Sequence, residues 1–176
     1  MNIRKADGFA LIDLLFVVAI IGVLATIALP RMLLARQSAG AASAIGTLRT
    51  IHSAQLTFAL TCGAGFYAPN LTTLGRAPVN STEAFISAGL ATSNSVTRSG
   101  YVITVDGTAF AGAPGSCNGL AVGEAAQGWR AYADPNDPEN FRFFGTNVNG
   151  AIWELNSTLS SVIPEVGEPT AGQLLK

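Results

Sequence analysis

The chain divides into one long apolar run and a remainder of mixed pattern. Residues 9–30 are almost entirely apolar and contain a single ionisable side chain, Asp13. At 1.5 Å per residue, a helix over this run would measure about 31 Å, just enough to cross the hydrocarbon core of a membrane. The preceding residues, 1–8, form a short polar segment with Arg4 and Lys5. These two cations favour a cytoplasmic N-terminus.

Beyond residue 30 the sequence is no longer uniformly apolar, and its apolar residues form a stripe with the pattern of one helix face. Apolar and small residues recur there at steps of three and four, which predicts an amphipathic continuation of the helix over residues 31–62, packed against a sheet. Gly63 and Gly65 predict the end of this helix. The residues of the stripe are Ala41, Ala44, Ile45, Leu48, Ile51, Gln55, Phe58 and Ala59.

The second half of the chain reads as loops and strands. Residues 63–99 are rich in Gly, Pro, Asn, Ser and Thr and are expected to form a loop region, with a short helix at 81–90. Residues 100–155 are expected to hold an antiparallel sheet of three to four strands, and 156–176 a polar surface tail. One long helix packed against such a sheet is an α+β fold. The predicted strands are 101–105, 129–133, 141–144 and 151–155, with turn signals at Asp106-Gly107 and Asn149-Gly150.

Composition excludes several function classes. Charged residues make up 12% of the chain and the net charge is −1, which argues against a dedicated nucleic-acid site. His52 is the only histidine, so no nucleophile–base pair of the Ser-His type can be assembled, and no phosphate-binding or dinucleotide motif is present. We therefore expect no enzyme and no cofactor. Asp134, Asp137 and Glu139 could offer oxygen ligands to Ca²⁺, but a solvated loop is the preferred interpretation and no metal site is predicted.

Both cysteines lie downstream of the apolar run. If that part of the chain is exported, a disulfide between Cys62 and Cys117 is expected. The alternative is two separate buried thiols.

The position of small residues indicates where the chain would be cleaved and whether the apolar run stays on the mature protein. No Ala-x-Ala cleavage site follows it, whereas Gly8 directly precedes it. Cleavage after Gly8 would keep the run on the mature chain and create a new amine at Phe9. Asp13 is costly in hydrocarbon, and that amine could neutralise it in the same chain or in a neighbour. The alternative is that Asp13 lies at the membrane interface and stays hydrated.

The N-terminal motif resembles that of type IV pilins and the related pseudopilins. The resemblance covers about 25 residues, Gly8-Phe9-Ala10-Leu11-Ile12-Asp13-Leu14-Leu15 and the run that ends at Pro30 with Gly22 inside it. It implies a pilin-like fold, cleavage after Gly8 and N-methylation of Phe9. It also implies that Asp13 pairs with the Phe9 amine of an adjacent subunit. The family usually has Glu where this chain has Asp13, so the reach is shorter by one methylene.

The resemblance further implies that the apolar helices pack as the core of a filament. Gly22 and Pro30 both weaken a helix, and pilin helices can melt between these positions during assembly. The implied partners are other copies of the chain in a helical homopolymer, a prepilin peptidase, an inner-membrane assembly platform and motor ATPases. The protein would lie in the inner membrane as a precursor and in an extracellular pilus afterwards. The alternatives are a periplasmic pseudopilin of a type II secretion system, or a minor pilin acting as an adhesin or DNA-binding module.

Overall fold

The computed structural model describes residues 11–175, apart from the side chains of residues 29 and 30. The chain divides into two compact units, with the boundary between Ser38 and Ala39. The elements, in chain order, are α1 (Leu11–Thr61), α2 (Leu71–Leu74), the 3₁₀ helix η1 (Ala88–Leu90), β1 (Ser95–Arg98), β2 (Tyr101–Asp106), β3 (Arg130–Pro135), β4 (Phe143–Asn147), β5 (Trp153–Leu155) and β6 (Gln173–Leu174).

The described part of the first unit, residues 11–38, is helical throughout and belongs to α1. The helix runs without interruption through Gly22 and Pro30. The hydroxyl of Thr26 donates to the carbonyl of Val23 at 2.7 Å, within the turns that precede the proline. Leucine, alanine and isoleucine dominate this sequence, and the first two are strong helix formers.

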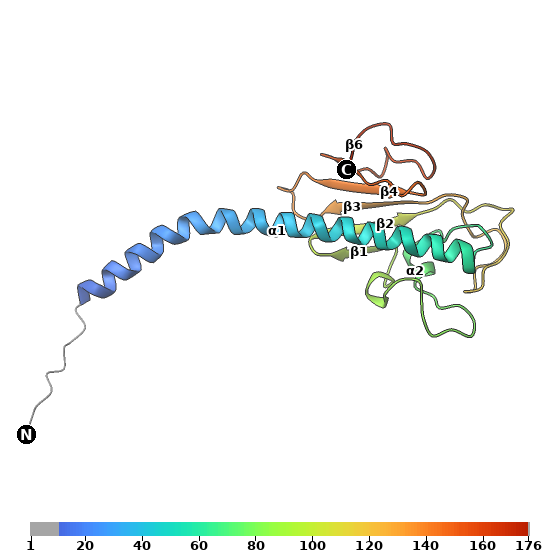
Figure 1. Cartoon of the computed structure of the whole chain (residues 1–176), viewed down its shortest axis with the longest axis horizontal. Helices are drawn as coiled ribbons and strands as arrows, with labels where there is room; N and C mark the ends of the chain where they lie inside the picture. Colours follow the sequence, from blue (N-terminus) through green and yellow to red (C-terminus); the bar gives the residue numbers. More distant parts are fainter. Residues whose placement is uncertain (1–10, 176) are drawn as a thin grey trace, which may run out of the picture. The chain divides into compact units, whose positions relative to one another are not determined.

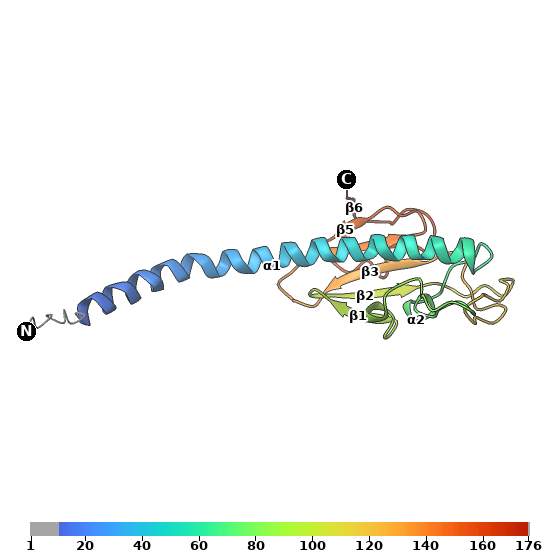
Figure 2. The same ribbon diagram turned by 60° about the horizontal axis from the view of Figure 1, so that its bottom comes forward.

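The second unit is an α+β domain built on one antiparallel sheet. The strands follow one another in sequence order from β1 to β6, and every neighbouring pair is antiparallel (Figure 1). The C-terminal part of α1 lies along one face of this sheet (Figure 2). The predicted fold class is therefore confirmed, whereas the predicted count of three to four strands is wrong.

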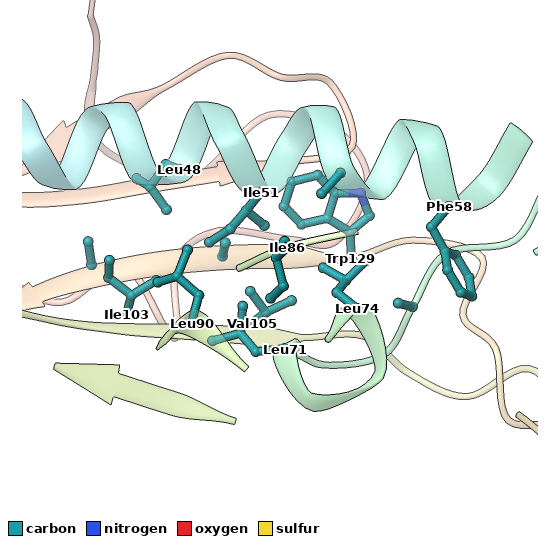
Figure 3. Packing of buried hydrophobic residues seen from close by; sticks show 14 of the residues in the cluster. Leu48, Ile51, Phe58, Leu71, Leu74, Ile86, Leu90, Ile103, Val105 and Trp129 are labelled. Atoms are coloured by element: carbon teal, nitrogen blue, oxygen red, sulfur yellow. The ribbon is translucent and has the colours of Figure 1, made fainter. Parts of the chain in front are cut away.

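The core of the second unit lies between α1 and the sheet. Leu48, Ile51 and Phe58 point from α1 toward residues of the sheet and of α2 (Figure 3). Every second residue of β2 faces this core, as expected for a strand with one buried face. The predicted stripe on α1 is confirmed, since all its members are buried except Ile45, which packs against the core as a partly buried residue. The core residues of the sheet are Tyr101, Ile103, Val105, Ala131, Ala133 and Phe144.

The two strands that the sequence did not reveal are edge strands. β1 is polar and mostly exposed, and a two-residue turn at Ser99-Gly100, with φ of 51° and 83°, joins it to β2. Positive φ at both central positions is the signature of the type I′ hairpin turn. β6 has only two residues and pairs with β5. Edge strands need only one partner and no buried face, so they lack the apolar alternation that predicts a strand.

The loop region also differs from expectation. A helix at 81–90 is wrong apart from its last turn, because only η1 is helical there. The strand β1 lies within the range expected to be loop. Helix α2 adds one turn, at whose start the side chain of Asn70 accepts a hydrogen bond from the amide of Thr73.

The C-terminal segment is not simply a surface tail. Leu159 and Ile163 are fully buried, and both side chains lie against Gly145 of β4. The Asn147 amide donates to the carbonyls of Pro164 at 3.0 Å and Gly167 at 2.7 Å. The segment therefore covers part of the outer sheet face, and the small residue at 145 makes room for it.

Candidate functional site

The candidate site is the apolar surface of α1 in the first unit. Fifteen large apolar side chains between Leu11 and Leu34 are each 45–76% exposed. We call this surface the exposed apolar run. The helix is long and apolar enough to cross a membrane, and none of the side chains in its most apolar window is buried. Fully burying side chains of this kind contributes about 1.5–3 kcal/mol each, so the gross contribution of covering the run is on the order of 20 kcal/mol or more.

An exposed apolar surface of this kind is expected to be buried against lipid or another protein. Single exposed apolar side chains are ordinary, but an apolar surface of this extent is typical of contact with a membrane or with another protein. By length and composition, the helix could cross a membrane, as a membrane anchor or a signal does. The second unit has a separate core, so it does not depend on the run for its own stability.

Asp13 is the carboxylate in the first turn of α1. It is exposed, and the ion pairs of the described residues, Arg130–Asp106 and Arg142–Glu154, do not include it. The proposed cleavage and methylation positions, Gly8 and Phe9, lie outside the described residues, so the predicted pairing of Asp13 stays a prediction.

Gly22 and Pro30 are both interior to α1. A Cβ built on Gly22 meets no atom within 4 Å in the single chain, so no contact of this chain requires a glycine there. A missing side chain on an exposed helix face permits close approach of a second helix. Pro30 removes one backbone donor from the helix, yet α1 remains helical on both sides of it. The predicted melting concerns an assembled state and stays a prediction.

The disulfide prediction is confirmed. Cys62 is bonded to Cys117, and their Cα atoms are 4.8 Å apart. Cys62 directly follows α1, but Cys117 lies on the long connection between β2 and β3 rather than on a strand. The bridge therefore ties the end of α1 to that connection and not to a strand of the sheet.

His52 packs inside the second unit. Its ring centre lies 5.8 Å from that of Trp129, and a Cβ on Gly150 would come within 2.7 Å of the imidazole. Burial lowers the pKa of His52, and a hydrogen bond with the backbone of Asn147 opposes that effect. The histidine therefore supports the turn between β4 and β5.

Among the described residues, Asp134, Asp137 and Glu139 do not form a cluster of metal ligands. Asp134 is half-buried at the end of β3, where its carboxylate accepts a hydrogen bond from the Thr158 hydroxyl at 2.8 Å. Burial raises the pKa of this carboxyl group, and the bond from Thr158 lowers it. Within residues 11–175 no three His, Cys, Asp or Glu side chains gather in the manner of a metal site.

Sequence reasoning missed two features of the second unit. One is Glu83, an exposed carboxylate on the wall of a groove beside α1. The other is Asn147, whose amide holds the C-terminal segment. A single Glu or Asn in a loop carries no pattern, so neither residue gives a signal before the chain is folded.

Comparison with known proteins adds no relative. Protein-family models, curated proteins and solved structures were searched, and none matches this chain. The N-terminal motif and the exposed apolar run are therefore the two features of the chain that bear on its function.

Proposed function

We propose that the protein is a structural subunit of a type IV pilus. In this proposal the precursor is inserted in the inner membrane, cleaved after Gly8 and N-methylated at Phe9, and it then polymerises by packing α1 of successive copies. Motor ATPases and an assembly platform would drive the polymerisation, and the filament would leave the cell. The observation that supports the proposal most is the exposed apolar run on a chain whose second unit folds around its own core.

Two environments can cover the run in turn. In the membrane, lipid tails contact the apolar side chains all round the helix. In the filament, the same side chains of neighbouring copies would replace the lipid, and small residues such as Gly22 would let the helices approach closely. A disulfide in the second unit fits the oxidising side of the membrane, where this unit would fold.

Asp13 would set the register between copies. An unpaired carboxylate at membrane depth costs about 2.5–3.5 kcal/mol. A charge pair at about 4 Å is worth on the order of 4 kcal/mol at the effective dielectric constant typical of protein surfaces. The pair of Asp13 with the Phe9 amine of the next copy would therefore offset the burial cost only at the correct axial offset.

The test replaces Asp13. We expect Asp13→Ala to leave membrane insertion and cleavage unchanged and to lower the yield of sheared filaments at least tenfold, because the amine of the next copy loses its counter-charge. Asp13→Glu is the matched control, since it keeps the charge and restores the longer reach. Filament yield of Asp13→Ala equal to that of the unmodified protein would refute the assembly role.

The same preparation separates a major pilin from its alternatives. A major pilin dominates the protein of sheared surface filaments. Trace amounts in that fraction would favour a minor pilin, and retention in the periplasm would favour a pseudopilin of a type II secretion system.

A further inference from the structure

A groove runs along α1 in the second unit. Its larger part has a volume of about 830 Å³ and lies between α1, at Ser43 and Thr50, and the segment that precedes β1. A second depression of about 440 Å³ continues along the helix to Thr57. The two parts share Thr50 and Glu83. From Ser43 to Thr57 the helix rises about 21 Å, so the groove follows roughly four helical turns.

The helix side of the groove offers few free hydrogen-bond donors. The hydroxyls of Thr47, Thr50 and Thr57 each donate to the carbonyl four residues earlier, at 2.9 Å. These side chains therefore present their methyl groups, and Gly46 and Ala54 add small surfaces between them. A polar ligand such as a sugar would find little to bind here, whereas a second helix can approach closely over small side chains.

The negative charge of Glu83 favours an occupant of the groove that carries a positive charge. Glu83 is exposed, it lines both parts of the groove, and neither of the two ion pairs formed by residues 11–175 includes it. Arg98 lines only the larger part. It adjoins Ser99, whose hydroxyl accepts a hydrogen bond from Ser43, so it stands at the Ser43 end. An occupant must therefore bring a cation to Glu83 and carry no cation opposite Arg98.

One element of the chain meets this requirement. Helix α1 carries no acidic residue after Asp13, and its cations, Arg31, Arg36 and Arg49, are all exposed. In parallel copies the residues that precede the arginine lie toward Arg98, and residues 14–30, which precede both Arg31 and Arg36, carry no charge. The C-terminal half of the chain, by contrast, holds eight of the eleven acidic residues, so that half would meet repulsion from Glu83.

We propose that this groove receives α1 of a neighbouring copy, with Arg31 or Arg36 of that copy binding the Glu83 carboxylate. The inference rests on the proposed filament, in which copies pack through α1. Successive copies in a filament are displaced along its axis. The groove of one copy therefore faces residues of the neighbour's α1 other than those that line the neighbour's own groove. In the sequence, Arg31 and Arg36 precede the α1 residues that line the groove, whereas Arg49 lies among them. The pair fixes the rotation and the axial offset of one copy relative to the next.

Charge reversal and rescue test the pairing in full-length protein assembled into filaments. Glu83→Lys lowers the yield of sheared filaments at least tenfold, with cleavage and membrane level unchanged. Glu168→Lys, the matched reversal of an exposed carboxylate outside the groove, stays within twofold of the unmodified protein. Adding Arg31→Glu or Arg36→Glu to the Glu83→Lys chain restores the yield to within threefold in one of the two combinations. Unchanged yield with Glu83→Lys overturns the proposal.

Cross-linking gives a second measurement that keeps both charges. Ala84 lines the groove beside Glu83, and Met32 and Ala35 are exposed neighbours of the two arginines. Filaments of Ala84→Cys combined with Met32→Cys or Ala35→Cys give a ladder of linked subunits on non-reducing gels for one of the two pairs. Filaments that form normally but give no ladder with either pair overturn the groove contact and leave the filament proposal standing. Absence of filaments from the unmodified protein overturns the proposed function itself.

Discussion

The amide of Gln55 makes two hydrogen bonds inside the core of the second unit. The side chain is fully buried, although it belongs to the apolar stripe of α1. Its Nε2 donates to the carbonyl of Ala68 at 2.8 Å, and its Oε1 accepts from the amide of Ala68 at 2.9 Å. Ala68 is itself fully buried, so water has no access to these two backbone groups.

Replacing Gln55 by methionine isolates the two hydrogen bonds. The volume is nearly conserved, so the cavity effect is small. The backbone N–H and C=O of Ala68 are left without partners, and each unsatisfied buried group costs about 1–3 kcal/mol. We therefore expect Gln55→Met to lower the free energy of unfolding by roughly 2–6 kcal/mol. Gln55→Ala should cost more, because a cavity is added to the same loss.

Thermal or denaturant unfolding of the oxidised protein in mild detergent measures this difference. Fluorescence of the buried Trp129 reports on the second unit. Gln127→Met is the matched control, because Gln127 is exposed and should change the free energy of unfolding by less than about 0.5 kcal/mol. A cost below about 1 kcal/mol for Gln55→Met, with an unchanged unfolding slope, would refute the assigned role of the amide.

Two further predictions concern stability. The Cys62–Cys117 bridge closes a separation of 55 residues, so replacing both cysteines by serine should cost about 4 kcal/mol in the chain-entropy model; the measurement is unfolding with and without reductant, and equal midpoints would contradict it. Burial lowers the pKa of His52, so the unfolded chain takes up this proton first and stability should fall as pH drops below about 6.5, the ordinary histidine value. His52→Gln should flatten the dependence of the unfolding midpoint on pH between 7 and 5, and an equally steep dependence in the variant would assign the protons to other groups.

Several elements followed from local pattern. The apolar stripe of α1 was predicted because a helix that packs on a sheet repeats its buried residues every three or four positions. The end of α1 before Gly63 and Gly65 was predicted because glycine tolerates the backbone that ends a helix, and Gly65 has a φ of 92°. The strand at residues 101–105 was predicted from its alternating, β-branched sequence, and it became β2.

Other elements depended on contacts that no local pattern encodes. Trp153–Leu155 was shorter than the predicted strand at 151–155, and the turn signal at Asp106-Gly107 leads into a long connection rather than a hairpin. The helix expected at 81–90 failed because that segment packs through isolated side chains such as Ile86 and Leu90 instead of a continuous helical face. Tertiary context overrides weak local preference in such segments.

The sequence by itself determined the apolar run, its single acid, the fold class and the presence of two cysteines able to pair. These properties follow from composition and from periods of two and three to four residues, which act within a few neighbouring positions. Only the tertiary structure decided that the Gln55 amide bonds the backbone of Ala68, that the Asn147 amide binds the C-terminal segment and that Glu83 lines a groove beside α1. Each of these contacts joins residues that are separated in the chain and meet only when the helix and the sheet pack. A single polar residue has no sequence pattern from which its partner could be predicted.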